Sequence, residues 1–402
     1  MEGRLKVIIG VLLVQVAGGA LYIWSRFIGP LMTAYDYTIN QTLWVYTITI
    51  ICFSVGLIFS AKLLAKKGPK TTATIGAIFF GGGVILASFA NSIVPLGLCY
   101  GVLGGLGSGI MYLAPLTTLV RWFPKNRGLA NGICIMGFAL ATLIFVPLAD
   151  VLLGTDQATP AIVHNTFLIM GLIYLAMTLV GSRMLVFPPG MASTILPETE
   201  VDVTTAEAAK SKQFWLVVGT VLFGCIPGVF LISSAANLGQ EMVGLTPVQA
   251  SLSVMALGIF NALGRVIAGW MGDKLGALRA YRIVFVITTL SVGLLVFVPV
   301  TTVTFMIAFS GIVLGFGATI ALGCTASLAL FGPKYYGMNV AYAMLAYGGS
   351  AFIAIIIKMY GNLDITQVFT ASFVASVLAL ILVVLIKPYT KKNKVNKLQK
   401  EA

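Results

Sequence analysis

The chain has 402 residues, of which 59% are hydrophobic and only 9% are charged, whereas an ordinary soluble domain carries roughly 25% charged residues. This composition excludes a soluble enzyme, a disordered chain and a nucleic-acid-binding protein, so the net charge of +13 needs another explanation. The only histidine is His164, and the five cysteines are far apart without a CxxC pair. We therefore expect no metal, no other cofactor and no enzymatic activity.

Twelve apolar runs are long enough to cross a bilayer as helices of about 20 residues. They cover 6–30, 41–64, 72–92, 95–120, 128–153, 163–186, 213–238, 247–271, 281–300, 303–330, 338–360 and 367–387. The runs are continuously apolar rather than alternating, which excludes a β-barrel. The sequence predicts an all-α integral membrane protein with twelve transmembrane helices, surrounded by the lipid bilayer.

Positive charge is distributed unevenly between the predicted loops. With the amino terminus inside, every Lys and Arg falls in an internal segment except Arg26, Arg265 and Lys358, which lie inside predicted helices. This is the positive-inside pattern. We expect both termini to be cytoplasmic and the protein to lie in the plasma (inner) membrane, with no nucleic-acid partner.

The predicted helices form two related sets of six. The segment 187–212 interrupts the apolar pattern and is interpreted as a cytoplasmic linker between a bundle at 1–186 and a second at 213–388, followed by a basic tail at 389–402. SAKLLAKKGPK at 60–70 matches AGWMGDKLGAL at 268–278, and TINQ at 38–41 matches TPVQ at 246–249, both at an offset of 208 residues. Parallel six-helix repeats of this kind describe the major facilitator architecture, with a substrate site near the midplane between the halves.

Arg265 is the strongest candidate for a substrate-binding residue. It lies eight residues before Asp273 in a predicted helix, about 12 Å deep at 1.5 Å per residue, and a charge at such depth is expensive unless it has a function. Asn261 lies one turn earlier on the same face. No acid lies within a turn of Arg265, and its planar fork suits a carboxylate. The alternative is an arginine held by carbonyl groups at a helix end.

Arg26 is a weaker candidate, near the outer end of the first helix with Tyr22 one turn below it. It could bind substrate, gate the site, reach lipid headgroups or pair with Asp36. No Asp or Glu lies clearly at the midplane, where a proton-coupled cation or drug exporter would need one. The sequence therefore indicates an anion carrier.

Aromatic residues occupy helices that are predicted to line a central cavity, where a tyrosine hydroxyl would supply a neutral donor to a carboxylate. They are Tyr22, Tyr112, Phe138, Phe316, Tyr342 and Tyr347.

The chain resembles the oxalate/formate antiporter family of the major facilitator superfamily, which is close to the monocarboxylate transporters. The resemblance rests on GALYIWS at 19–25, RWFPKNRGLANG at 121–132, QFW at 213–215, FNALGR at 260–265 and GDKLG at 272–276. It implies that Arg265 binds the substrate carboxylate and that Tyr22 and Tyr112 wall the cavity. Phe138 replaces a tyrosine of the oxalate carrier, and Phe316 is aligned with one of its cavity aromatics.

Two further departures concern the substrate and its coupling. Tyr347 stands where the oxalate carrier has a lysine for the second carboxylate, which argues against oxalate. Asn261 stands where animal monocarboxylate transporters have an aspartate, which argues against proton coupling by that route.

A cytoplasmic gate is also predicted. Asp273 lies near the start of the fifth helix, beside Arg121, Lys125 and Arg127. We predict that a contact from Asp273 to this cluster, or to the amino terminus of the fifth helix, favours the outward-open state.

These observations predict a secondary active transporter for a small carboxylate anion, working by alternating access. A monocarboxylate of the lactate, pyruvate and formate class is favoured, carried by proton symport or by exchange. The alternatives are an oxalate/formate antiporter and a carboxylate sensor that does not transport. We expect a monomer.

Overall fold

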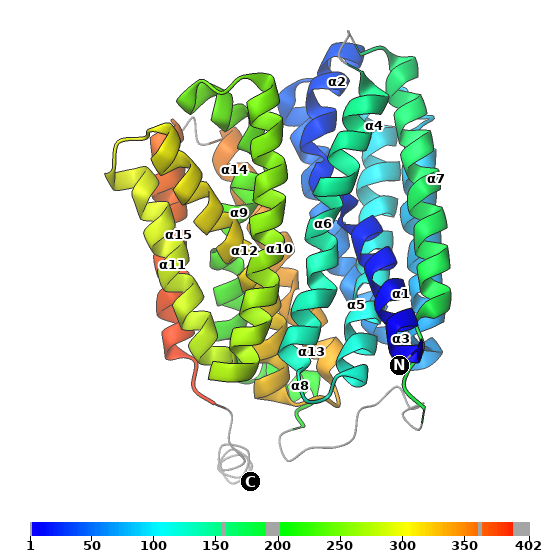
Figure 1. The fold of residues 1–402 in the computed structure, drawn as a ribbon, viewed down its shortest axis with the longest axis vertical. Helices are drawn as coiled ribbons and strands as arrows, with labels where there is room; N and C mark the ends of the chain where they lie inside the picture. Colours follow the sequence, from blue (N-terminus) through cyan, green and yellow to red (C-terminus); the bar gives the residue numbers. More distant parts are fainter. Residues whose placement is uncertain (1, 155–157, 190–201, 361–363, 389–402) are drawn as a thin grey trace.

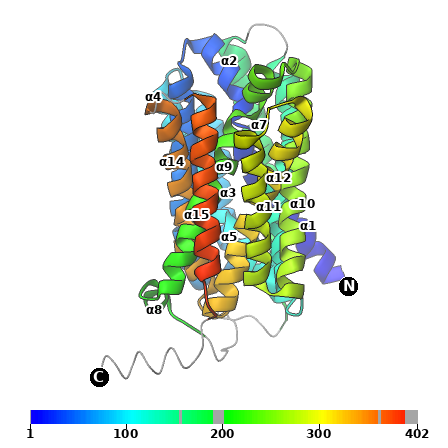
Figure 2. The same ribbon diagram turned by 90° about the vertical axis from the view of Figure 1, so that its left-hand side faces the viewer.

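The computed structural model describes residues 2–154, 158–189, 202–360 and 364–388, and within these ranges the regular secondary structure is entirely helical. Figure 1 shows two bundles side by side, α1–α7 and α9–α15. We call them the N-terminal and C-terminal halves. The long helices run roughly parallel to one another between the two ends of the molecule, as Figure 2 shows. The expected all-α membrane fold is confirmed.

The N-terminal half begins with a helix that changes type twice. Its elements are α1 Glu2–Gly18, η1 Gly19–Ile23, α2 Ser25–Tyr35, α3 Ile39–Ala87, α4 Ile93–Leu96, η2 Gly97–Gly104, α5 Gly105–Trp122, α6 Arg127–Leu153 and α7 Pro160–Met184. The C-terminal half follows a short linker helix, α8 Thr205–Ala209. Its elements are α9 Lys212–Val243, α10 Pro247–Leu275, α11 Ala277–Phe297, α12 Thr302–Phe331, α13 Tyr336–Ala343, α14 Leu345–Tyr360 and α15 Ile365–Leu385.

Eleven helices in the described residues are long and apolar enough to cross a membrane, whereas the sequence predicts twelve spans. The difference lies in α3, which has 49 residues and would measure about 73 Å as one straight helix, over twice the thickness of a bilayer core. Gly68, with a φ of 74°, interrupts its helical backbone immediately before Pro69. α3 therefore contains the whole of the predicted span 41–64 and most of the predicted span 72–92, which extends five residues beyond the end of α3.

The two matched segments adopt the same local structure. Thr38 with Gln41 forms a capping box at the start of α3, and Thr246 with Gln249 forms one at the start of α10. At the other end of the matched region, Gly68 and Gly276 both have positive φ, 74° and 85°, a conformation that favours glycine. The repeat seen in the sequence is therefore also present in the backbone.

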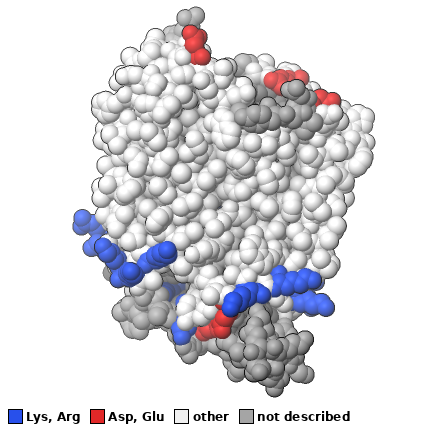
Figure 3. All heavy atoms as spheres, turned by 180° about the vertical axis from the view of Figure 1, so that it is seen from behind, with Lys and Arg blue, Asp and Glu red and all other residues white. Residues whose placement is uncertain are grey.

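Charge separates along the long axis of the molecule. In Figure 3, Lys and Arg side chains gather at one end and acidic side chains lie mainly at the other, with a broad uncharged band between them. We call these the basic end and the acidic end; α1 begins and α15 ends at the basic end (Figure 1). Large apolar side chains such as Phe89 and Trp270 are more than half exposed. This surface is that of a membrane-embedded protein.

Candidate functional site

Arg265 of α10 lies between the two halves and is 1% exposed. Its Nε donates to Oδ1 of Asn261 at 3.0 Å, its Nη1 donates to the carbonyl oxygen of Ile135 at 2.6 Å, and its Nη2 donates to the Tyr22 hydroxyl at 3.1 Å. Asn261 belongs to the same helix, whereas Ile135 in α6 and Tyr22 in η1 belong to the N-terminal half. The guanidinium therefore joins the two halves directly.

All three acceptors of Arg265 are neutral, and no acid contacts its side chain in the part of the chain that the structure describes. A guanidinium has five N–H donors, so this arrangement satisfies its hydrogen bonding in part and leaves its charge uncompensated. Burying an uncompensated charge is costly. An anion that reached Arg265 would relieve that cost.

A glycine in α6 permits this contact. A Cβ atom placed on Gly132 would lie 2.5 Å from the carbonyl oxygen of Arg265, so any side chain there would push α10 away from α6. The glycine lets the two backbones approach until Nη1 reaches Ile135.

Five of the six predicted cavity aromatics come together, and Tyr342 makes no ring contact with them in the described residues. Tyr22 packs edge-on to Phe138 at 5.2 Å between ring centroids and lies 6.4 Å from Phe316. Phe138 also contacts Tyr112 at 5.5 Å, and Phe316 contacts Tyr347 at 6.1 Å. All five are buried. The cluster crosses the interface, because Phe316 and Tyr347 belong to the C-terminal half.

Phe53 of α3 also belongs to this cluster, although the sequence did not single it out. Its ring lies 5.3 Å from that of Tyr112 and 6.0 Å from that of Tyr347. The Tyr347 hydroxyl is buried without a hydrogen-bond partner among the described residues. A buried hydroxyl in this condition is expensive unless a ligand satisfies it.

Two small cavities adjoin Tyr22. The first is lined by Tyr22, Asn261 and Thr142, together with Leu257 and Gly258. Leu257 precedes Asn261 in α10, which runs from the acidic to the basic end, so this cavity lies on the acidic side of Arg265. Its walls combine an amide and two hydroxyls with apolar groups, as small-ligand sites do.

The second cavity shares Tyr22 with the first and is also lined by Ser25 and Tyr46. The Ser25 hydroxyl is buried and lacks a hydrogen-bond partner in the described ranges. Sequence reasoning missed Thr142, Ser25 and Tyr46. A serine between Trp24 and Arg26 in a membrane helix was the one available signal.

Arg26 does not reach Arg265 in this structure. Its Nε donates to Oδ1 of Asp150 at 2.7 Å, and Nη2 lies 2.5 Å from the same oxygen. Asp150 lies in the last turn of α6, 124 residues away in sequence. The expected alternative of a pair with Asp36 is therefore wrong.

Aromatic rings gather beside α2 at the acidic end. Tyr35 stacks on Tyr37 at 5.2 Å between centroids and lies 6.1 Å from the His164 ring. Burial raises the pKa of the Tyr35 hydroxyl, and the neighbouring Tyr37 raises it further; burial also raises the pKa of Tyr37. Both hydroxyls are therefore neutral at physiological pH.

Asp273 contacts the amino terminus of α6 at the basic end. Its two carboxylate oxygens accept hydrogen bonds from the backbone N–H groups of Gly128 and Leu129, both at 2.8 Å. The residue before α6, Asn126, makes no capping hydrogen bond with its side chain, so the cap comes from the other half of the protein.

Arg121 and Arg127 were expected to surround Asp273. The Arg121 guanidinium lies 3.9 Å from the centre of the Phe187 ring, and Arg127 begins α6. Neither forms an ion pair with Asp273 in the described part of the chain. The aspartate therefore meets the helix terminus rather than the arginine side chains.

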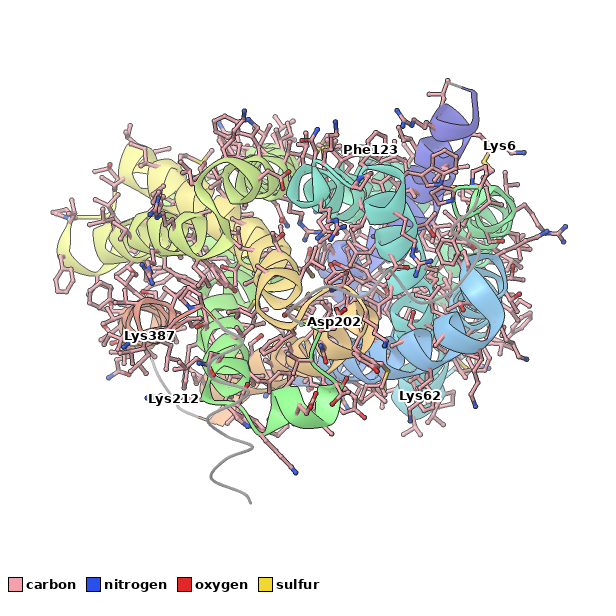
Figure 4. The ribbon with its side chains drawn as sticks, turned by 90° about the horizontal axis from the view of Figure 1, so that it is seen from below. Lys6, Lys62, Phe123, Asp202, Lys212 and Lys387 are labelled. Carbon is pink, nitrogen blue, oxygen red and sulfur yellow. The ribbon has the colours of Figure 1, made fainter. Side chains whose placement is uncertain are left out.

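Other contacts close the basic end. The Asn131 amide of α6 donates to the Tyr336 hydroxyl of α13 at 3.1 Å, across the two halves. The linker is held to the C-terminal half, because Thr205 donates to the Asn339 amide oxygen at 2.8 Å and the Lys334 backbone N–H donates to Asp202 at 3.0 Å. In Figure 4, which looks onto this end, Asp202 lies near the middle while Lys6, Lys62, Lys212 and Lys387 lie around the rim.

Comparison with known proteins identifies the family. The family model described as Major Facilitator Superfamily matches residues 8–355 and 228–402. The chain is 29% identical over 346 residues to the uncharacterized MFS-type transporter YhjX of Escherichia coli (strain K12), covering 86% of this chain and 85% of the relative. It is 25% identical over 386 residues to the oxalate:formate antiporter of Oxalobacter formigenes, covering 92% and 89%. It is 27% identical over 366 residues to monocarboxylate transporter 13 of Bos taurus, covering 89% and 82%.

Solved structures agree on the fold. A bacterial homologue of the iron transporter ferroportin in the outward-facing state superposes with a TM-score of 0.70 at 16% identity, covering 96% of this chain and 99% of the other. The transporter FucP in the outward conformation gives 0.66 at 12% identity, covering 93% and 98%. Such low identities show the fold alone, but the family model matches far more than half of this sequence. The chain therefore belongs to the major facilitator superfamily of membrane transporters.

Proposed function

We propose that this protein is a secondary active transporter of a small monocarboxylate, working by alternating access between the two ends of the molecule. The basic end faces the cytoplasm, because positively charged segments stay on that side of a membrane. This places both termini in the cytoplasm and the acidic end outside the plasma membrane. The working unit is the monomer, since the candidate site lies between the two halves of one chain.

The observation that carries the proposal is the buried Arg265 with neutral acceptors only. A substrate entering the cavity beside Tyr22 and Asn261 would offer its carboxylate to the guanidinium, and a charge-assisted bond to a carboxylate is about twice as strong as a neutral one. Because Arg265 belongs to one half and Tyr22 to the other, binding there would change the contact between the halves. The Arg265 guanidinium would thus take part both in substrate binding and in alternating access.

The charges around the site favour a monoanion. Arg26 is paired with Asp150, so Arg265 contributes one uncompensated positive charge and Tyr347 adds a neutral hydroxyl. A single carboxylate matches that charge, whereas a dianion such as oxalate would leave one negative charge in the membrane interior. The relative from Oxalobacter keeps oxalate/formate exchange as the second candidate.

Uptake of labelled lactate, pyruvate, formate and oxalate into reconstituted vesicles tests the proposal. Each is offered to vesicles preloaded with the same compound and to empty vesicles under an inward proton gradient. Uptake only into preloaded vesicles would mean exchange, and uptake into empty vesicles driven by the gradient would mean proton symport. Oxalate taken up in preference to the monocarboxylates would contradict the charge argument, and binding without uptake would indicate a sensor.

Arg265→Lys is the decisive variant, because lysine keeps the charge but not the planar fork. We expect uptake to fall about 100-fold, in the range of truncating one partner of a buried charge pair. Arg279→Lys, an exposed change at the basic end, is the matched control and should transport normally. Normal uptake by a folded Arg265→Lys protein would refute the site.

A further inference from the structure

We propose that Arg26 is a second carboxylate-binding site at the acidic end, and that Asp150 is a tethered carboxylate that occupies Arg26 until a substrate displaces it. The inference rests on the proposed function, because it requires a carboxylate to pass this point. It goes beyond that function by assigning a role to Asp150 and an order to the two arginines.

The geometry of the pair leaves room for a better ligand. Arg26 contacts one oxygen of Asp150, Oδ1, twice, from Nε at 2.7 Å and from Nη2 at 2.5 Å. These two nitrogens form one edge of the guanidinium, which binds a carboxylate most favourably when each nitrogen meets its own oxygen. A free carboxylate can adopt that arrangement.

Ideal helical spacing places Asp150 on the face of α6 that is turned toward the C-terminal half. It follows Gly132 by 18 residues, which is five helical turns, so both residues lie on the same face. Gly132 faces the backbone of α10 at Arg265. Asp150 thus lies about 27 Å further along that face, toward the acidic end.

The sequence neighbours of Arg26 lie between it and the central site at Arg265. Ser25 and Tyr22 line one small cavity, and Tyr22 accepts the hydrogen bond from Arg265. Tyr22 and Arg26 are separated by one helical turn. A carboxylate released from Arg26 would therefore meet the Ser25 and Tyr22 hydroxyls before it reached Arg265.

The pair is accessible to an arriving anion. The side chains of Arg26 and Asp150 are 28% and 33% exposed, whereas Arg265 is 1% exposed. Ion pairs as exposed as this one contribute little net stability, so displacement of Asp150 by a substrate is feasible.

Three variants test the role of Asp150 in transport from the acidic end. Asp150→Asn removes the competing charge, and we expect the KM for uptake into intact cells to fall about twofold to fivefold, within the range of exposed ion pairs. Arg26→Gln should raise that KM. In the double variant the benefit of Asp150→Asn should disappear, because it acts only through Arg26.

Inverted vesicles supply the directional control, since they present the basic end to the substrate. There the KM of Asp150→Asn should equal that of the unmodified protein. If the Arg26–Asp150 pair serves only to hold α2 against α6, its loss in either single variant would instead lower the melting temperature without a fall in KM. If Asp150→Asn does not fold, Asp150→Ser carries the same expectation.

Several results would overturn the inference. An unchanged or raised KM in folded Asp150→Asn, an equal fall from both ends, or a fall that persists without Arg26 would each do so. If the unmodified protein transports while Arg265→Lys does not, and Asp150→Asn has no effect on KM, then only the role of Asp150 fails. Absence of any carboxylate transport by the unmodified protein would refute both proposals.

Discussion

The two halves of the protein meet differently at the basic and acidic ends. Toward the basic end the contact is between backbones: a Cβ on Gly128 would lie 2.5 Å from the carbonyl oxygen of Gly269, and Asp273 and Asn131 add hydrogen bonds across the interface. Toward the acidic end the contact is between side chains, such as the Trp44 and Phe352 rings at 6.3 Å.

Small cavities border the acidic region. Leu43, Tyr46 and Thr47 of α3 line one of them together with Phe230 of α9 and Ala351 of α14, on the acidic side. Side chains can change rotamer and cavities can fill with water, whereas backbones in contact must move apart as whole helices. We infer that, starting from the conformation of this structure, the two halves separate first at the acidic end. Arg265 lies at the boundary between the two regions.

Gly132→Val should change the difference between the two ends most, because it forces a side chain into the backbone contact between α6 and α10. Overpacking of this kind costs about 2 kcal/mol, so we expect a roughly 30-fold shift away from the state closed at the basic end, using 1.4 kcal/mol per factor of ten. Spin labels at Lys66 and Arg279, both exposed at that end, would report a longer distance in a background without native cysteines.

Gly82→Val is the matched control for that change. A Cβ on Gly82 would have no atom within 4 Å, so the label distance should stay that of the unmodified protein. A distance that stays short in Gly132→Val, or that lengthens equally in both variants, would show that the backbone contact does not hold the basic end closed.

Asp273→Asn should have a smaller effect in the same direction. The amide keeps one acceptor but loses the charge that interacts with the α6 amino terminus, a loss of about 1 kcal/mol for an exposed helix cap. We expect a modest rise in the population open at the basic end, measured with the same two labels. Glu207→Gln, which removes an acid at the same end from the cap of α8, should change nothing. An unchanged ratio in Asp273→Asn would refute its predicted gating role.

Sequence reasoning reached the features that are encoded locally. The match of TINQ with TPVQ and of Gly68 with Gly276 is visible in the sequence as a repeat, and the structure shows these positions as capping boxes and positive-φ glycines. The depth of Arg265 and its contact with Asn261 follow from helical spacing.

The remaining contacts of the site could not be read in this way. Ile135 contributes a backbone carbonyl to Arg265. Because every residue has such a carbonyl, the residue type does not indicate which one accepts the hydrogen bond. Asp150 reaches Arg26 only because α2 and α6 pack together, and the nearby Asp36 was a plausible partner by spacing alone. The buried Ser25 hydroxyl depends on packing in the same way.

Tyr347→Phe should have the smallest effect on the fold and the most selective effect on transport. It tests only the region in which the two halves meet through side chains. The Tyr347 hydroxyl is buried without a partner in the described residues, so removing it should leave the melting temperature unchanged or slightly raised. If a substrate oxygen satisfies that hydroxyl, uptake of lactate and pyruvate should fall about fivefold, equivalent to about 1 kcal/mol, while uptake of formate changes less. Tyr174→Phe, a buried change within the N-terminal half, controls for the loss of a tyrosine hydroxyl elsewhere. An equal fall for all three substrates would mean that Tyr347 shapes the cavity without recognising the hydroxyl or keto oxygen that lactate and pyruvate carry and formate lacks. A stable variant with unchanged uptake would show that Tyr347 does not belong to the site.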